Sequence, residues 1–173
     1  ADRLIARLPE YLHTARRMPW LFNLRNRVPG AAWLGERVLG LSARRSLPEL
    51  RSDTFWSERD ATLFTSRDMV IAAACSGRKS AVLFVDTFNG GFESENAWAA
   101  ARVLKAAGYL LHTVEKFSGH YCCGRTYLAQ GWVEEAKAHA GALVDALLPL
   151  AEAGVPIVGL EPSCLLTLRD EAL

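Results

Sequence analysis

Three short apolar runs alternate with two longer amphipathic segments in the second half of this chain. The apolar runs are 81–86, 109–114 and 155–160, and the longer segments are 94–108 and 132–154. Runs of the first kind predict buried strands, and segments with apolar positions at helical spacing predict helices. Strands that alternate with helices of this length predict a parallel sheet with right-handed crossovers. We therefore expect an α/β fold, in which helices flank a small parallel sheet.

The two predicted helices carry end signals and an apolar face. Ser94 is a possible N-cap for the first helix, and Gly108 follows its end. In the second, Pro149 bends the last turn and Gly154 ends the helix. Its expected core-facing positions are Val133, Ala136, Ala140, Leu143, Val144 and Leu147.

The chain before this pattern predicts a helical arm and linker over 1–60, followed by the α/β domain over 61–173. Apolar positions at helical spacing between prolines predict short helices in the first forty residues, and the polar stretch 42–60 predicts a linker. Residues 61–80 allow two interpretations. Ser66 can cap a short helix, or "MVIAAAC" can form a buried strand, with Cys75 as a small core residue in either case.

The charge is unevenly distributed. Residues 1–51 hold ten arginines and four acidic residues, a net charge of +6, whereas residues 52–173 hold ten basic and fifteen acidic residues, a net charge of −5. The arginines lie among Leu and Trp without a nucleic-acid-binding motif, so we expect no nucleic-acid partner. We expect the arm to dock on its own acidic domain or on a neighbouring one.

Apolar stretches such as 69–75 are too short to span a bilayer, and no signal segment opens the chain. The four cysteines do not have the even spacing of a disulfide framework, which favours a reducing, cytoplasmic location. Because the chain begins with Ala rather than Met and ends on what resembles the start of a helix, we expect a piece of a longer polypeptide.

The cysteines stand where predicted strands end. Cys122 and Cys123 follow the second strand in "EKFSGHYCCGRT", and Cys164 follows the third in "EPSC". Ligands of an open α/β sheet gather beyond the carboxyl ends of its strands, so we expect these three thiols at one edge. We also expect both sites to begin helices, whose N-termini stabilise thiolates.

Adjacent thiols bring two soft donors to one point, and Gly124 allows a tight bend around them. The alternative is a tight turn with two inert sulfurs. Cys164 either completes the same site or belongs to the next helix. His120 is a further possible ligand, which would make a zinc site of cysteine and histidine, or it is a solvated loop residue.

Other polar residues near the strand ends allow two interpretations each. Glu161 is either an oxygen ligand or an ion-pair partner of Arg125 or Arg169. Asp86 and Asn89 either orient a ligand or tie down their loop.

Hydrolase motifs are missing from the sequence, and "NGG" at 89–91 lacks the features of a phosphate-binding loop. We expect His13, His112 and His139 to be surface or packing residues.

The motifs "CCGRT", "GLEPSCLLTLRDE" and "VLFVDTFN" resemble the cysteine-rich CCG domain of iron–sulfur oxidoreductases over about 81–173. This family includes heterodisulfide reductase and glycolate oxidase subunits, and the likeness is greatest to the C-terminal region of FAD-linked D-lactate-dehydrogenase-type oxidases. The resemblance implies a Rossmann-like CCG module that transfers electrons through an iron–sulfur cluster of the 4Fe–4S type. It also implies that FAD binds a separate domain of the parent protein, with flavin and ferredoxin-like domains as partners.

In the family pattern a cysteine follows the first strand and C-x-x-C ends the module, but this chain has Thr87 and Glu161 at those positions. The resemblance leaves Cys122, Cys123 and Cys164 as ligands of a cluster or, with His120, of zinc. The alternatives are a docking domain without a cluster or with zinc, and a thiol–disulfide redox module. A homodimer through a bare sheet edge is also possible.

Overall fold

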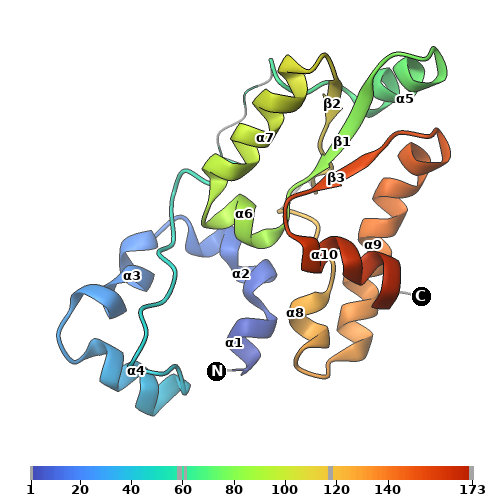
Figure 1. Ribbon diagram of the computed structural model, residues 1–173. Coiled ribbons are helices and arrows are strands. Elements are labelled where there is room, and N and C mark those ends of the chain that lie inside the picture. The colour runs from blue at the N-terminus through green and yellow to red at the C-terminus, as the bar shows by residue number, and fades with distance from the viewer. Residues whose placement is uncertain (1, 58–59, 61, 117–118, 172–173) are drawn as a thin grey trace.

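The computed structural model describes residues 2–57, 60, 62–116 and 119–171. Figure 1 shows a small open sheet with helices on both sides and a helical arm. In chain order the elements are α1 (Asp2–Ala6), α2 (Leu8–Ala15), α3 (Pro19–Arg27), α4 (Ala31–Leu39), α5 (Arg67–Cys75), β1 (Ser80–Phe84), α6 (Thr87–Gly91), α7 (Ser94–Ala106), β2 (Leu110–His112), α8 (Arg125–Leu128), α9 (Val133–Glu152), β3 (Ile157–Gly159), α10 (Pro162–Leu166) and the π-helical turn η1 (Thr167–Glu171).

The predicted α/β fold is confirmed. The three strands lie in the order β2-β1-β3, and both neighbours of β1 run parallel to it. Ser80 of β1 is opposite Leu110 of β2, and Leu83 is opposite Val158 of β3. All three carboxyl ends therefore lie at one edge of the sheet.

Alternate residues of β1 pack into two separate hydrophobic cores, one on each face of the sheet. Successive side chains of a strand point to opposite faces. Val82 and Phe84 face a cluster built with α5 and α9, which includes Leu143 and Leu147. The intervening Ala81, Leu83 and Val85 pack instead against α7, with Ala97, Ala101 and Phe55. The strand is thus buried on both faces, which explains its uninterrupted apolar sequence.

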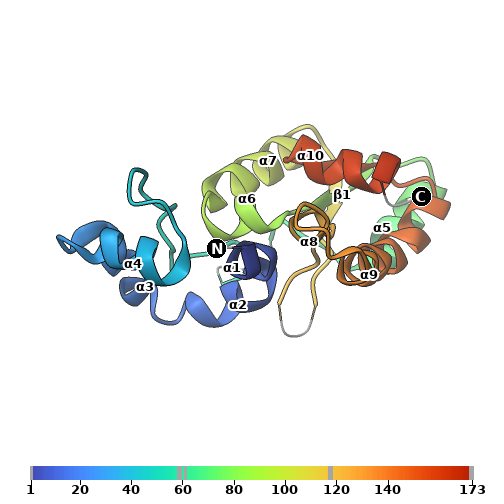
Figure 2. The same ribbon diagram turned by 90° about the horizontal axis from the view of Figure 1, so that it is seen from below.

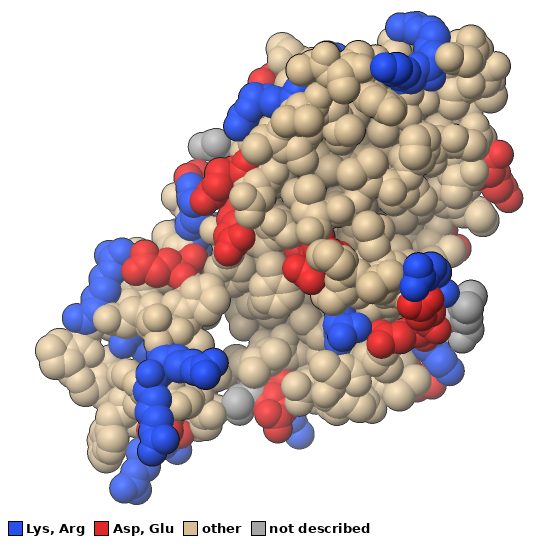
Figure 3. Space-filling view, viewed as in Figure 1, with Lys and Arg blue, Asp and Glu red and all other residues tan. Residues whose placement is uncertain are grey.

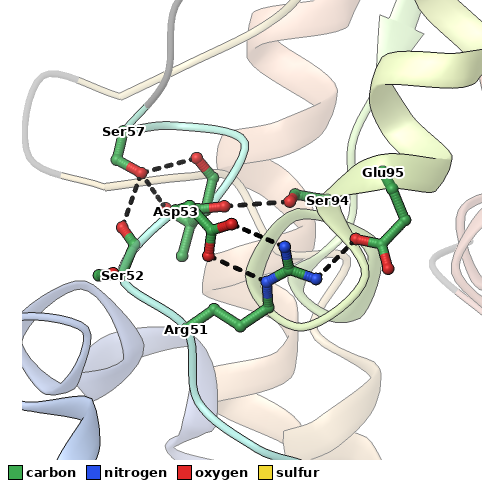
Figure 4. A network of polar contacts seen from close by, with 7 residues as sticks. Arg51, Ser52, Asp53, Ser57, Ser94 and Glu95 are labelled. Carbon is green, nitrogen blue, oxygen red and sulfur yellow. Dashed lines mark hydrogen bonds and ion pairs between the residues drawn. The ribbon is translucent and has the colours of Figure 1, made fainter.

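The segment 42–60 contains no helix or strand in its described part, but it is not a loose connection. The Phe55 side chain is 2% exposed and joins the core on the α7 side of the sheet. Figure 4 shows the polar contacts beside it, where Arg51 binds Asp53 at 2.6 Å and Glu95 at 2.9 Å. The Ser94 hydroxyl donates to the Asp53 carbonyl at 3.0 Å, so this segment is tied to the start of α7.

The arm has two parts. Helices α1 and α2 dock on the α/β domain, where Thr126 donates to the Ala6 carbonyl and Tyr127 donates to Glu10 at 2.8 Å. Helices α3 and α4 project away from the domain at the left of Figures 1 and 2. The short helices divided by prolines are confirmed, with Pro19 in the first turn of α3.

Residues 67–75 form helix α5 rather than a strand, and the Ser66 hydroxyl accepts a hydrogen bond from the Met69 backbone as expected of a cap. The prediction that Cys75 is a core residue is wrong, because its side chain is exposed. The buried face of α5 contains Val70 and Ala73. A residue five positions after Val70 points away from that face.

Two further expectations about helix residues are wrong. Ser94 is the first residue of α7 rather than its cap, because its hydroxyl donates a hydrogen bond to the Asp53 carbonyl. Val133 and Val144 are exposed on α9, although Ala136 and Leu143 are buried as predicted. Within the described ranges, no helix is long and apolar enough to cross a membrane.

Candidate functional site

The three cysteines after the strands come together at the carboxyl edge of the sheet. Cys122 and Cys123 lie between β2 and α8, and Cys164 lies in α10 after β3. All three are buried and line one cavity of about 220 Å³. The cavity also contains Thr87 and Asp86, which follow β1. The expectation that these residues share one edge is confirmed, and both cysteine sites lie beside or within the first turn of a helix.

Gly124 brings the cysteine pair against α9. Its φ is +85°, and a Cβ atom at this position would overlap the backbone carbonyl oxygen of Ala136. The Gly124 N–H donates to the Cys122 Sγ at 3.4 Å. Only glycine combines this positive φ with so close an approach to another helix. Gly124, the third residue of "CCG", therefore lets the cysteine pair lie close to α9.

The thiols are not activated. Interaction with Cys123 and burial both raise the pKa of Cys122 far above its usual range. Interaction with Cys122 lowers the pKa of Cys123, but the neighbouring Cys164 and burial outweigh it and raise that pKa to about 12. The expectation of stabilised thiolates is not met for Cys122 and Cys123, because their sulfurs lie against one another away from water.

His120 is fixed beside this cavity but does not line it. Its Nε2 lies 2.9 Å from the Thr87 hydroxyl, and its ring stacks on Trp56 with centroids 4.1 Å apart. Burial, with a smaller contribution from Lys116, lowers the pKa of His120 to about 3. The ring is therefore neutral at physiological pH, and the expectation of a solvated loop residue is wrong.

Glu161 acts as the cap of α10. Its Oε1 accepts hydrogen bonds from the backbone N–H of Ser163 at 3.2 Å and from the Ser163 hydroxyl at 2.6 Å. The carboxylate is therefore used by its own helix rather than directed at the thiols.

The two arginines suggested as partners of Glu161 pair elsewhere. Arg125 binds Glu171 at 3.1 Å, and Arg169 binds its neighbour Asp170 at 2.7 Å. Arg125 is nevertheless a lining residue of the cavity. It places one positive charge near the three sulfurs.

Asp86 ties down its own loop, which was one of the two interpretations. Its Oδ1 accepts from the backbone N–H groups of Phe88 and Asn89 at 2.8 and 3.1 Å. The Asn89 side chain donates to the Asp86 Oδ2 at 2.7 Å. The side chains of Asp86 and Asn89 therefore both have hydrogen-bond partners at the start of α6.

The residues present do not fit a four-ligand metal centre. The described part of the chain has no group of three or more His, Cys, Asp or Glu side chains arranged to hold a metal ion. Thr87 and Glu161, at the positions where the family pattern has cysteines, have hydrogen-bond partners of their own. Three thiols without another ligand leave a cluster incompletely held.

The sequence did not indicate Trp56 or Tyr127 as residues near the site. Trp56 stacks on His120, and Tyr127 stacks on His139 with centroids 4.6 Å apart. His139 is thus a packing residue, as expected, and the His112 ring contacts the Thr65 carbonyl. No local pattern identifies Trp56, because its segment has no periodic apolar positions.

Comparisons with protein-family models, with curated proteins and with solved structures found no match to this chain. The likeness to the CCG domain therefore rests on the sequence motifs alone.

Proposed function

We propose that this chain is a CCG-type module of an FAD-linked iron–sulfur oxidoreductase that acts on a D-lactate-like or glycolate-like acid. Its role in that enzyme is that of a scaffold domain beside the flavin and ferredoxin-like domains, without a cluster of its own. The unpaired cysteines favour a reducing, cytoplasmic location. By itself the chain is expected to have no dehydrogenase activity.

One observation favours a scaffold domain over a module that holds a cluster. Three cysteines of the motif share a cavity, but Thr87 and Glu161 at the two remaining motif positions are hydrogen-bonded to His120 and Ser163. A cluster would require these contacts to break or a ligand from outside. In this proposal the three buried thiols line the cavity without holding a metal.

The second candidate is an electron-carrying or zinc-holding module. The convergence of Cys122, Cys123 and Cys164 favours it, because sulfur ligands select iron–sulfur clusters and zinc. In that case the protein would position the centre and tune its potential through burial and hydrogen bonds to sulfur.

Thiol–disulfide exchange has less support. Exchange needs a thiolate as the attacking group. The raised pKa values of Cys122 and Cys123, and their burial, keep both thiols protonated and shielded at neutral pH.

The test is the iron, zinc and acid-labile sulfide content of the chain after anaerobic purification, with its visible absorption spectrum. The Cys122→Ser/Cys123→Ser variant is measured beside it. The scaffold proposal expects no stoichiometric metal in either protein. Iron and sulfide that are present in the wild type and lost in the variant would establish an electron carrier instead, and zinc lost in the same way would establish a zinc domain.

A further inference from the structure

Helices α3 and α4 present an apolar surface that stays largely exposed in the described part of the chain. We call it the α3–α4 face and define it by Trp20, Leu21, Trp33, Leu34 and Val38. Trp20 is 62% exposed, Trp33 is 59% exposed and Val38 is 70% exposed. Helix α4 buries none of its residues, and α3 buries only Asn23. Two nine-residue helices gain no stability from such a surface in water.

The contacts that join these helices to the segment 41–50 are polar. Asn23 exchanges two hydrogen bonds of 2.9 Å with the backbone of Leu50. The Arg25 guanidinium donates to the carbonyls of Ser42 at 2.6 Å and Leu41 at 3.3 Å. Polar side chains thus hold the hairpin of α3 and α4 to the chain, whereas most of its large apolar side chains stay exposed. Exposed Trp, Leu and Val side chains beside such polar contacts indicate that the α3–α4 face meets an apolar medium.

The surroundings of the face are strongly basic. Residues 16–45 contain seven arginines, no lysine and the single acid Glu36. Within the described residues, Arg17, Arg37 and Arg44 form no ion pair with a carboxylate, and the Arg37 guanidinium lies 5.4 Å from the Trp33 ring centre. Figure 3 shows blue arginine atoms around the projecting end of the molecule, with tan side chains between them. Arginine is suited to phosphate, which it can bind through two hydrogen bonds.

We propose that the α3–α4 face binds the surface of a membrane that carries anionic phospholipids. Trp, Leu and Val enter the boundary between headgroups and acyl chains, and the arginines around them bind lipid phosphates. The helices lie on the surface, because nine residues are too few to cross a bilayer.

The shape of the arm favours a lipid surface over an acidic protein. The hairpin projects beyond the rest of the molecule in both ribbon views, so it can meet a plane without a shaped partner (Figures 1 and 2). This inference is independent of the role proposed for the cysteine cavity.

The test is flotation of the whole chain with vesicles. Phosphatidylcholine vesicles are compared with vesicles of phosphatidylcholine and phosphatidylserine in equal parts. We expect binding to the second kind alone, with a blue shift of tryptophan emission. Raising the ionic strength from about 0.1 M to 1 M shortens the screening length from about 10 Å to 3 Å and should weaken the binding.

Two variants locate the contact. Trp20→Ser/Trp33→Ser should abolish the emission shift, and Arg17→Gln/Arg37→Gln/Arg44→Gln should lower the partition coefficient by roughly fivefold per arginine. The controls Val103→Ser and Arg78→Gln/Arg102→Gln change residues that are also exposed, but on the α/β domain. Circular dichroism confirms that each variant is folded.

Three results would overturn the proposal. They are absence of the chain from the anionic vesicles, equal losses in the arm variants and the controls, and binding to polyglutamate-coated beads without binding to vesicles. The last result would assign the face to an acidic protein partner.

Discussion

The hydroxyl of Thr87 lies 2.9 Å from Nε2 of His120, and both side chains are buried. This pair occupies the place at which the CCG pattern has its first cysteine. The His120 ring is in turn stacked on Trp56, so a segment far away in sequence holds the contact in position. Where the pattern has a sulfur ligand, the cavity with Cys122 and Cys123 therefore has a hydroxyl that is hydrogen-bonded to a neutral imidazole.

Thr87→Cys/Glu161→Cys would supply the two missing sulfurs of the motif. We expect this variant to gain iron, sulfide and a broad visible absorption band after anaerobic reconstitution, because two more thiols complete the ligand set. The wild type treated in the same way is the comparison. The gain should disappear when Cys122→Ser/Cys123→Ser is added, and a wild type that takes up as much iron would contradict the scaffold role.

His120 should make the stability of the fold depend on pH. Its pKa in the folded chain is about 3, below the usual value of about 6.5, so the unfolded chain binds the extra proton first. The stability that the neutral His120 ring contributes to the fold is complete above pH 6.5 and is lost as the pH falls from about 6.5 towards 3. From pH 7 to pH 5 the free energy of unfolding should fall by about 2 kcal/mol, measured by urea denaturation.

His120→Gln removes the titrating group and should abolish most of this loss between pH 7 and pH 5. The matched control is His112→Gln, which changes a ring that contacts the Thr65 carbonyl and leaves His120 in place. An unchanged pH dependence in His120→Gln would show that the ring is not held neutral in the folded chain.

Gly124→Ala should destabilise the fold more than Gly131→Ala. Both glycines have a positive φ, +85° and +76°, so alanine is strained by about 1 kcal/mol or more at either position. A Cβ at Gly131 meets no atom, whereas at Gly124 it meets the carbonyl of Ala136 in α9. We expect an additional loss of about 1–3 kcal/mol in chemical denaturation for Gly124→Ala. Equal losses would mean that α9 yields to the new methyl group.

Thiol reactivity should separate Cys75 from the other three cysteines. Cys75 is exposed, whereas Cys122, Cys123 and Cys164 are buried. We expect one thiol of the native chain to react rapidly with an aromatic disulfide reagent and all four to react in denaturant. Cys75→Ser should remove the rapid phase. A rapid phase that persists in Cys75→Ser would show that the cavity opens to solvent.

The sheet and its helices could be predicted because the signals for them are local. The run 81–86 is uniformly apolar since β1 is buried on both faces, and Gly108 and Gly154 mark the ends of α7 and α9 with positive φ. The edge shared by the cysteines also followed from the sequence, because parallel strands place all their carboxyl ends together.

Other contacts join segments that are distant in the sequence, and no local pattern predicted them. The burial of Phe55, the stacking of Trp56 on His120 and the use of Ser94 by Asp53 each join residues more than thirty positions apart. The sequence by itself determined the strands, the helices and the edge at which the thiols meet, because periodicity and chain direction are properties of short stretches. Only the tertiary structure decided that Thr87 has His120 as its partner and that Cys122, Cys123 and Cys164 are buried, because such contacts depend on what packs around a side chain.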